Sequence, residues 1–225
     1  MKQPFWRRAL SYAKEVHIET TESDHNPYLH VVLRNGRYQL CTENAIYSYG
    51  DLYDNFTKAF KKIDLDRLKI ENVLILGFGL GSIPLILETL FQKKYHYTAV
   101  EIDPEVLRLA NRYVVRELKS NIEFHIMDAY TYVHYCDEKF DMICMDVFLD
   151  DVVPEELEQA DFLENLKEML TPDGILLFNK LAFQKKDKIQ AENFFKNPFK
   201  TVFTEGVYLD VEGNYILLNR GDVLR

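Results

Sequence analysis

The segment from Asn72 to Asp103 constrains the fold more than any other part of the sequence; it reads NVLILGFGLGSIPLILETLFQKKYHYTAVEID. It begins with a wholly apolar run, Val73 to Leu76, which is typical of a strand buried on both faces of a sheet. Glycines occupy the alternate positions 77, 79 and 81, and apolar residues at helical spacing follow from Ile83 to about Lys93. The pattern predicts a strand, a glycine-rich turn and a helix capped by Ser82.

A second apolar run, Tyr97 to Ile102, contains Glu101, which stands twenty residues after the last glycine. A strand, a glycine turn, a helix and a second strand ending on an acid form the nucleotide-binding half of a doubly wound parallel sheet. Gly77, Gly79 and Gly81 would let the backbone turn sharply and approach a ligand closely. Glu101 would accept hydrogen bonds from the ribose hydroxyl groups of that ligand.

The glycine spacing separates two classes of nucleotide cofactor. A dinucleotide fingerprint needs its third glycine at position 82, where this chain has Ser82. The pattern G-x-G-x-G resembles instead the first motif of S-adenosylmethionine-dependent transferases. Such a loop can also be a plain tight turn, but the strand before it and Glu101 after it favour a nucleoside site.

The composition is that of a globular protein with an acidic surface. Hydrophobic residues make up 47% of the 225 residues, charged residues make up 28%, and the formal net charge is -9. This charge argues against a nucleic-acid partner and is compatible with a cationic substrate. Three cysteines without a CxxC pair indicate free thiols in a reducing, cytoplasmic environment. We find no signal peptide, membrane-spanning run or set of metal ligands in the sequence, so we expect neither a membrane partner nor a metal.

Residues 1–60 are predicted to form an N-terminal domain made of a helix and a small β-sheet. Residues 1–16 place Phe5 and Trp6 among basic residues, as in a short amphipathic helix. Such a helix can anchor a protein to a membrane surface, but packing on its own protein or on a sister subunit is the preferred interpretation. From His17 to Cys41 the apolar period changes to two, and Asn35-Gly36 between alternating runs predicts a β-hairpin.

A dense group of tyrosines and acids follows in residues 42–60, TENAIYSYGDLYDNFTKAF, much of which is predicted to be helical. An aromatic stripe usually belongs to the hydrophobic core of a protein. Tyrosine rings beside carboxylates can also enclose a cationic or ring-bearing substrate, and both interpretations stay open at this point.

Residues 61–225 continue in alternating helices and strands and are predicted to form the main domain. The expected helices span 104–118, 154–170 and 187–195, and the expected strands span 122–127, 140–145, 175–178, 200–207 and 214–218. A turn at 171–174 precedes the strand at 175–178, and the last two strands form a terminal hairpin. The chain is therefore predicted to be an α/β protein, a Rossmann-like seven-stranded methyltransferase sheet preceded by a small antiparallel β-domain.

Four acids fall at the predicted carboxyl ends of strands, where open α/β sheets bind their ligands: Glu101, Asp103, Asp128 and Asp146. Asp103 precedes a proline and is expected to cap a helix instead. Glu101 suits the ribose, Asp128 the adenine amino group, and Asp146 the reacting end of the cofactor. Buried acids gathered at one edge require a ligand rich in donors or a cation, and an adenosyl sulfonium supplies both.

From His17 to its C-terminus the chain resembles the spermidine synthase family, the polyamine aminopropyltransferases and their methyltransferase-fold relatives. The family's linking segment is similar to GRYQLCTENAIYSYGDLYDNF, and its active-site strand is similar to FDMICMDVF. Its ribose and adenine motifs are similar to AVEIDPEVLRLANRY and IEFHIMDAYTYV. The resemblance implies a homodimer, and it implies that the cofactor contacts Gly77, Gly79, Gly81, Glu101, Ile102, Asp128, Ala129 and Asp146.

The sequence departs from the family at positions that serve aminopropyl transfer. Family synthases read roughly D-S-S-D-P after the fourth strand, and their second acid deprotonates the attacking amine. Here Leu149 stands at that base position, with Asp150 and Asp151 displaced from it. Leu80 replaces the glycine-loop acid that selects the decarboxylated cofactor, whereas the family's Tyr49 is retained. Further family residues are replaced by Asn44-Ala45 and Gly50.

The sequence therefore predicts a spermidine-synthase-like transferase that binds S-adenosylmethionine, or a related adenosyl sulfonium, and alkylates a small nucleophile such as an amine. Methyl transfer is favoured, with Asp146 or Asp150 as the base and Tyr49 positioning the substrate. One alternative is a polyamine aminopropyltransferase that uses decarboxylated S-adenosylmethionine, with Asp150 or Asp151 as the base. The other is a non-catalytic relative that keeps the nucleoside pocket.

Overall fold

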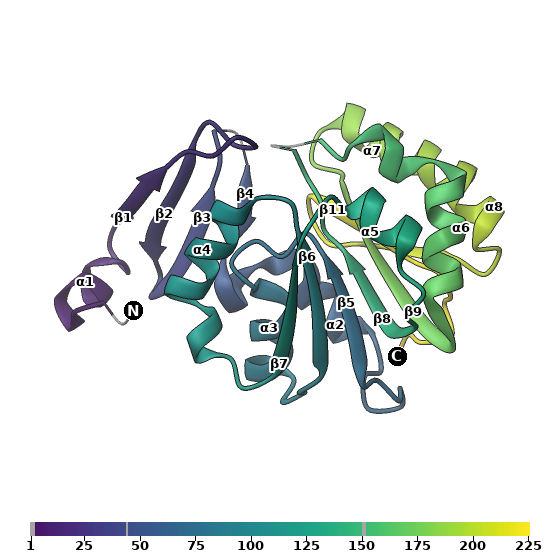
Figure 1. Cartoon of the computed structure of the whole chain (residues 1–225), viewed down its shortest axis with the longest axis horizontal. Helices are drawn as coiled ribbons and strands as arrows, with labels where there is room; N and C mark the ends of the chain where they lie inside the picture. The colour runs from purple at the N-terminus through teal and green to yellow at the C-terminus, as the bar shows by residue number, and fades with distance from the viewer. Residues whose placement is uncertain (1–2, 44, 150–151) are drawn as a thin grey trace.

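The chain folds into two sheets that lie side by side, a small N-terminal one and a larger one flanked by helices (Figure 1). The structure is a computed structural model that describes residues 3–43, 45–149 and 152–225. Within these residues no helix has the length and apolarity needed to cross a membrane. The predicted arrangement of a small antiparallel sheet before a seven-stranded sheet is confirmed.

The small sheet contains four antiparallel strands in chain order, β1 (Val16–Thr21), β2 (Leu29–Arg34), β3 (Arg37–Cys41) and β4 (Ile46–Ser48). Strands β2 and β3 are joined by Asn35-Gly36, both at positive φ, as a tight hairpin turn requires. This confirms the predicted hairpin. The helix predicted for residues 1–16 is shorter, since α1 covers Phe5–Leu10 and none of its residues is buried.

The segment predicted to be largely helical divides into three elements. Strand β4 takes its first part, a short 3-10 helix, η1 (Gly50–Leu52), follows, and helix α2 (Asp54–Lys62) completes it. The helix α2 extends across the predicted domain boundary at residue 60. Leu29, Val31 and Leu40 of the small sheet belong to the same apolar cluster as Phe56 and Phe60 of α2. The division at residue 60 therefore stays a prediction, because one core serves both sides of it.

The seven-stranded sheet has the order β10-β11-β9-β8-β5-β6-β7. Five strands are parallel, and β11 pairs antiparallel with both β9 and β10, which forms the predicted terminal hairpin. The strands are β5 (Asn72–Leu76), β6 (His96–Glu101), β7 (Asn121–Ile126), β8 (Phe140–Met145), β9 (Leu170–Leu181), β10 (Val207–Asp210) and β11 (Asn214–Leu218).

Helices cover both faces of this sheet, which explains the wholly apolar run at Val73 to Leu76. Val73 and Ile75 pack with α2, α3 (Ser82–Leu90) and α4 (Pro104–Tyr113), while Leu74 and Leu76 pack with the opposite helical layer. That second layer contains α5 (Ala129–Tyr135), α6 (Ala160–Met169), α7 (Lys185–Phe194) and α8 (Lys200–Val202). Four consecutive strand residues are thus fully buried, as a central parallel strand requires.

Local predictions after residue 150 also differ from the structure. The strand expected at 200–207 is wrong: residues 195–202 form a π-helical turn, η4 (Phe195–Phe199), and α8, and β10 begins only at Val207. Phe199, Val202 and Phe203 follow helical spacing and pack with Leu74 and Leu76 in the apolar cluster on the α5–α8 side of the sheet. This burial outweighs their strand propensity. The helix expected at 154–170 is divided into a 3-10 helix, η3 (Glu155–Glu158), and α6, while the turn expected at 171–174 belongs to β9.

Candidate active site

A cavity of about 870 Å³ opens at the carboxyl ends of β5, β6 and β8. Strand β4 and η1 close it on one side, and the start of α7 closes it on the other. This is the edge at which parallel α/β sheets bind ligands. The cavity brings together most of the residues predicted from the sequence: Tyr49, Gly77, Gly79, Glu101, Ile102, Asp128, Ala129 and Asp146.

Two predicted site residues, Gly81 and Asp150, are absent from this set. Gly81 lies at the N-cap of α3 with φ +87, and a Cβ there would come within 2.8 Å of the Phe78 ring, so its role is in the turn. Ser82, expected as the cap, begins the helix and binds Ser48 Oγ and the Tyr49 amide instead. Asp150, the second candidate base, lies outside the residues that the structure describes.

Gly77 allows the ends of β5 and β8 to approach each other. Its φ is +82, and a Cβ at this position would lie 2.4 Å from the carbonyl oxygen of Asp146. No side chain fits at that distance, so only glycine keeps the loop this close to the backbone of Asp146. The glycine requirement predicted from the sequence therefore has a structural reason even before a ligand is considered.

Glu101 is fixed by backbone amides of the cavity wall. Its Oε2 accepts hydrogen bonds from the amides of Phe78 and Gly79, each at 3.1 Å, and its Oε1 accepts from the amide of Asp103 at 3.2 Å. Burial raises the pKa of Glu101, and these three donors oppose the increase. A carboxylate has about four acceptor positions, so Oε1 keeps one for a ligand hydroxyl.

Asp103 and Asp128 both cap helices, as their place before a helix requires. Asp103 Oδ1 accepts from the Glu105 amide at 2.9 Å at the start of α4, which confirms the expected cap. Asp128 Oδ1 accepts from the amide of Thr131 at 2.8 Å and from its hydroxyl at 3.1 Å. Asp128 also lines the cavity, whereas Asp103 is fully buried behind it.

Asp146 follows β8 and lines the cavity. Its Oδ1 accepts from Asn179 Nδ2 at 2.7 Å and from the Tyr53 hydroxyl at 3.3 Å. Asn214 Nδ2 in turn donates to Asn179 Oδ1 at 2.9 Å, which fixes the amide orientation. Burial, with a smaller contribution from the charge of Glu101, raises the pKa of Asp146 to about 7 despite these hydrogen bonds.

Two tyrosines of the linking segment have different contacts. Tyr49 lines the cavity, but its hydroxyl accepts from Asn35 Nδ2 at 2.9 Å, at the hairpin turn of the small sheet. Tyr53 donates its hydroxyl to Asp146, and burial raises its pKa well above the ordinary value, so it stays protonated. Tyr53 belongs to the tyrosine-rich segment that could enclose a substrate, but its contact with Asp146 was not predicted, and Asn179 was missed as a site residue. A lone asparagine in the apolar run ILLFNKL was the available signal for Asn179.

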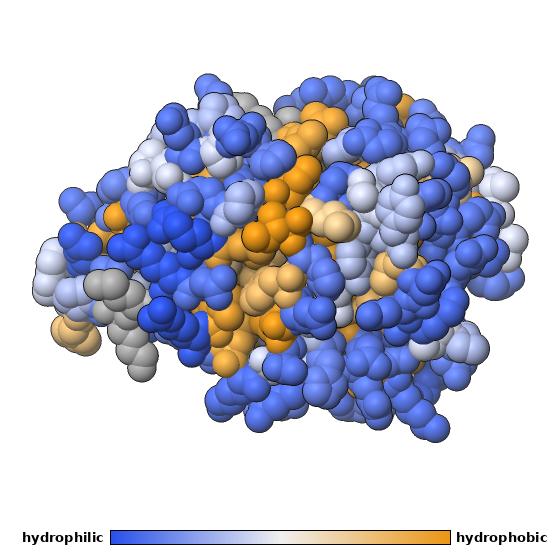
Figure 2. All heavy atoms as spheres, in the orientation of Figure 1, coloured by the Kyte–Doolittle hydropathy of each residue, from blue (hydrophilic) through white to orange (hydrophobic). Residues whose placement is uncertain are grey.

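The two leucines at positions where the family resemblance predicts acids lie in different surroundings. Leu80 is buried in the apolar core and does not line the cavity. Leu149 lines the cavity mouth, is 50% exposed, and pairs with Val152 through two backbone hydrogen bonds of 2.8 and 3.1 Å. Ile46, Leu52 and Phe183 are further exposed apolar side chains that line the cavity. On the face drawn in Figure 2 hydrophobic residues form a band between two hydrophilic areas.

The side chains that line the cavity suit an adenosyl ligand. Among residues 3–43, 45–149 and 152–225 no group of three His, Cys, Asp or Glu side chains is placed to hold a metal ion. The cavity instead combines an apolar wall with carboxylates at three strand ends. Such a wall suits an adenine ring, and the carboxylates suit ribose hydroxyls, an amino group and a positive charge.

Sequence comparison finds relatives of two activities. A polyamine aminopropyltransferase of Vibrio vulnificus is 35% identical over 120 residues, which are 52% of this chain and 40% of that protein. The human eEF1A lysine and N-terminal methyltransferase is 29% identical over 119 residues, 48% of this chain and 17% of that protein. The chain therefore spans less than half the length of these curated relatives.

Solved structures of both kinds of enzyme share this fold. Human methyltransferase-like protein 13 in complex with SAH is similar with a TM-score of 0.55 and 26% identity, over 68% of this chain and 72% of that one. A spermidine synthase in complex with the transition state analogue AdoDATO has a TM-score of 0.68 and 16% identity, over 90% of this chain and 72% of that one. The spermine/spermidine synthase domain model matches residues 56–211, which are most of the chain and contain the glycine loop, Glu101, Asp128 and Asp146, whereas Tyr49 and Tyr53 precede the matched range. The chain belongs to the spermine/spermidine synthase domain family.

Proposed function

We propose that the protein binds S-adenosylmethionine in this cavity and transfers its methyl group to an amine. The observation that carries the proposal is the convergence of Gly77, Glu101, Asp128 and Asp146 on one cavity. Human methyltransferase-like protein 13, which was solved with SAH, supports an adenosyl ligand for a chain of this fold.

Each residue has a defined task in this proposal. Glu101 accepts a ribose hydroxyl through the acceptor position left on Oε1, and Ile102 and Ala129 contact the adenine ring. Asp128 uses Oδ1 for its helix cap, so Oδ2 is the oxygen offered to the adenine amino group. Gly77 and Gly79 bring the loop backbone close to the ligand.

S-adenosylmethionine supplies an electrophilic methyl group on a sulfonium, so the protein's own contribution is to align the nucleophile and to remove its proton. Asp146 is the proposed base. A pKa of about 7 leaves a substantial part of its carboxylate ionised at neutral pH and able to take the proton released by the amine. Tyr53 and Asn179 hold Oδ1, which leaves Oδ2 for the amine. Asp150 stays a second candidate for this role.

The replacement of acids favours methyl transfer over aminopropyl transfer. A decarboxylated cofactor carries an extra ammonium group, which needs a nearby carboxylate when it leaves water. The glycine loop presents Gly77 and Gly79 to the cavity, and its Leu80 points into the core. Polyamine synthesis is the alternative, and the Vibrio vulnificus relative supports it. A relative without catalytic activity is the third candidate.

A calorimetric titration with S-adenosylmethionine and with its decarboxylated form tests the proposal. We expect tighter binding of the carboxylated cofactor and methylated product from a panel of amines. Tighter binding of the decarboxylated form, together with spermidine formed from putrescine, would establish the alternative. Binding without any product would identify a non-catalytic relative, and no binding of either ligand would contradict the assignment of the cavity.

We further propose a homodimer in the cytoplasm. Phe5 and Trp6 of α1 are 86% and 60% exposed, so this helix presents apolar surface for a sister subunit. The three cysteines are free thiols, which suits a reducing compartment. Sedimentation of the wild type and of Trp6→Glu measures the assembly state, and a wild type that sediments as a monomer at every concentration contradicts the dimer.

A further inference from the structure

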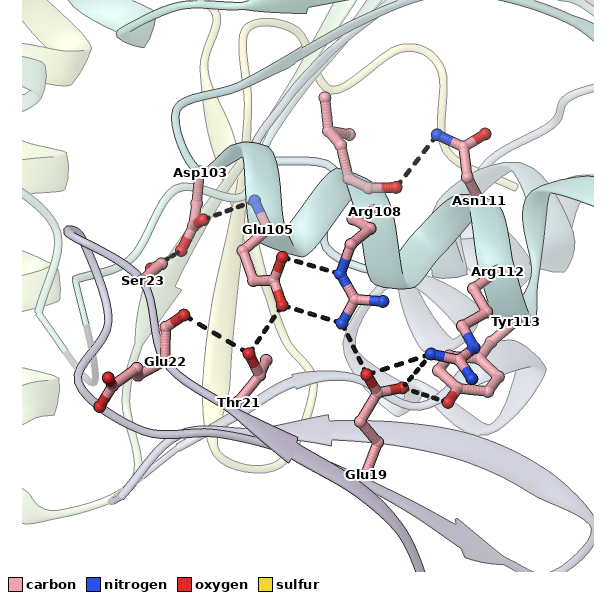
Figure 3. Close-up of polar contacts among 11 residues, drawn as sticks. Glu19, Thr21, Glu22, Ser23, Asp103, Glu105, Arg108, Asn111, Arg112 and Tyr113 are labelled. Atoms are coloured by element: carbon pink, nitrogen blue, oxygen red, sulfur yellow. Dashed lines mark hydrogen bonds and ion pairs between the residues drawn. The ribbon is translucent and has the colours of Figure 1, made fainter.

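The turn between β1 and β2 in the small sheet reaches the carboxyl end of β6, beside the proposed ribose site. Asp103 lies there, two residues after Glu101, and is fully buried. Its Oδ2 accepts from Ser23 Oγ at 2.5 Å and from Asn26 Nδ2 at 2.8 Å, and both donors belong to that turn. Figure 3 shows Ser23 pointing at Asp103 from the small sheet, with the Glu105 amide on the other carboxylate oxygen.

We propose that Ser23 and Asn26 are positioning residues for the cofactor, which act through Asp103 on the ribose-binding carboxylate of Glu101. This inference rests on the proposed function, because it requires Glu101 to contact the ribose. Neither Ser23 nor Asn26 lines the cavity, so their effect is transmitted and not direct.

A single hydrogen bond joins Asp103 to Glu101. The amide of Asp103 donates to Glu101 Oε1 at 3.2 Å, the same oxygen that keeps an acceptor position for a ligand hydroxyl. Ile102, between the two acids, lines the cavity. Any displacement of Asp103 therefore moves a donor to Glu101 and one wall of the adenine site together.

Asp103 depends on its three donors because it is cut off from water. A buried carboxylate without hydrogen bonds is costly, and bonds to a charged acceptor are stronger than neutral ones. The Glu105 amide satisfies Oδ1, while Ser23 and Asn26 satisfy Oδ2. Without these two side chains Oδ2 would have to reach water or another donor, and the backbone at Asp103 would move.

Asn26 also connects to the opposite cavity wall. Its Oδ1 accepts from the Tyr47 hydroxyl at 3.2 Å, and Tyr47 of β4 lines the cavity. Asn26 is 8% exposed, so both ends of its amide are engaged in an enclosed place. One side chain thus joins the wall built by β4 to the strand end that carries Glu101.

Side chains on β1 also hold helix α4, which begins just after Asp103, against the small sheet (Figure 3). Thr21 Oγ1 donates to Glu105 Oε1 at 2.7 Å, and Arg108 binds Glu105 at 2.8 Å and Glu19 at 2.6 Å. These contacts begin two residues after Asp103 and continue along α4. They restrain the helix, whereas Asp103 at its start is held by Ser23 and Asn26.

The test measures the preference for a ribose over a deoxygenated sugar. We would determine by calorimetry the Kd of 5′-methylthioadenosine and of its 2′,3′-dideoxy analogue for the wild type, Asn26→Ala and the milder Ser23→Ala. The ratio of the Kd of the dideoxy analogue to the Kd of 5′-methylthioadenosine should fall about three- to tenfold in Asn26→Ala, since one hydrogen bond is worth about that factor. In the Glu101→Gln background, which already lacks the ribose carboxylate, Asn26→Ala should not change the ratio further.

His25→Ala is the matched control, because this exposed side chain lies in the same turn and makes no contact with Asp103. Equal weakening of both ligands by Asn26→Ala and Ser23→Ala would mean a purely structural role and would overturn the positioning role. An unchanged ratio in a folded variant would also overturn it. A wild type that binds both analogues equally would refute this inference together with the ribose role of Glu101, whereas a wild type that binds neither would refute the proposed function as a whole.

Discussion

Asp146 is protonated at a higher pH than an ordinary aspartate, because burial and the charge of Glu101 raise its pKa to about 7. An aspartate in the unfolded chain has a pKa of about 4. Between these two values the folded protein binds more protons than the unfolded one, so its free energy of unfolding falls as the pH rises through that window. The carboxylate still reaches the cavity, which makes this cost smaller than that of a fully buried charge.

We expect Asp146→Asn to be more stable than the wild type near pH 8 by about 1–3 kcal/mol, and equally stable below about pH 3, where the aspartate is protonated in both states. The asparagine can keep the hydrogen bonds from Asn179 and Tyr53. It cannot accept a proton from an amine, so methyl transfer should be lost while cofactor binding stays measurable. Urea denaturation at both pH values checks the stability, and full activity in the variant would remove Asp146 from the mechanism.

The pH dependence of the wild-type reaction follows from the same residue. The ionised form of Asp146 is the base, so kcat should rise with pH and level off above about 7, the raised pKa of this carboxyl. Rates measured at saturating cofactor and acceptor give the profile. A rate that falls as the pH rises through this range would contradict the proposed role.

Gly77→Ala should disrupt the cavity, since its Cβ would lie 2.4 Å from the Asp146 carbonyl oxygen and its φ is +82. We expect a loss of more than about 3 kcal/mol in the free energy of unfolding, together with loss of adenosyl-ligand binding. Gly213→Ala is the control, because its φ is +115 and the nearest atom, in Phe183, is 3.6 Å away. The control should lose only about 1–2 kcal/mol from backbone strain. Equal losses in the two variants would show that steric contact with Asp146 is unimportant.

The site residues that the sequence could reveal are those belonging to one local pattern. Gly77, Gly79 and Glu101 stand in a single strand–turn–helix–strand unit, so their spacing was enough to predict them. Tyr53 lies 93 residues from Asp146 in the chain, and Asn179 lies 33 residues from it. Their contacts exist only after β9 and η1 have been brought to β8, which no local spacing encodes.

At the scale of elements, helix α4 is joined to β1 by a charged network centred on Glu19 (Figure 3). Glu19 accepts from Arg108 at 2.6 Å, from Arg112 at 3.1 Å and from the Tyr113 hydroxyl. Burial alone would raise the pKa of Glu19, but the hydrogen bonds from Tyr113 and Arg108 and the charges of both arginines lower it. A lowered pKa in the folded state stabilises the protein above the unfolded pKa, and this stabilisation is lost as the pH falls through the lowered value.

Glu19→Gln should therefore reduce the free energy of unfolding at pH 7 by about 1–2 kcal/mol, an amount that allows for the partial exposure of the carboxylate. The difference from the wild type should shrink below about pH 4, where Glu19 becomes protonated. Glu212→Gln is the control, because Glu212 is 85% exposed and forms a surface ion pair with Lys58. That variant should stay within about 0.5 kcal/mol of the wild type. A Glu19 variant as stable as this control would show that the network does not hold β1 to α4.

Elements were predicted well where one period extended over many residues, and poorly where two tendencies competed. Strands β5 and β8 have apolar runs that only a buried strand explains. Residues 200–207 contain β-branched and aromatic residues, yet Phe199, Val202 and Phe203 turn one helical face into the core. Strand β4 has only three residues and pairs with β3 across a register shift, so its pattern is too short to detect.

At the scale of the whole molecule, the two sheets share one apolar core. Val31 and Leu40 of the small sheet lie in the same cluster as Ile75 and Cys144 of the large one, with α2 and α4 contributing to it. Asp103 and the Glu19 network add polar contacts across the same boundary. Neither sheet buries its apolar face alone, so we expect the chain to unfold as one cooperative unit.

Hydrogen exchange measures this cooperativity directly. The amides of Val31 and Leu40, paired between β2 and β3, should exchange with the same opening free energy as those of Ile75 and Cys144, paired between β5 and β8. S-adenosylhomocysteine at about 100 times its Kd should raise both opening free energies by about 2.7 kcal/mol, because a ligand that binds only the folded state stabilises everything that unfolds with its site. Faster exchange in the small sheet, unchanged by the ligand, would show instead that the small sheet opens independently. In that case the contacts of Asn26 and Ser23 with Asp103 would break without loss of the cofactor, which contradicts a positioning role for this sheet.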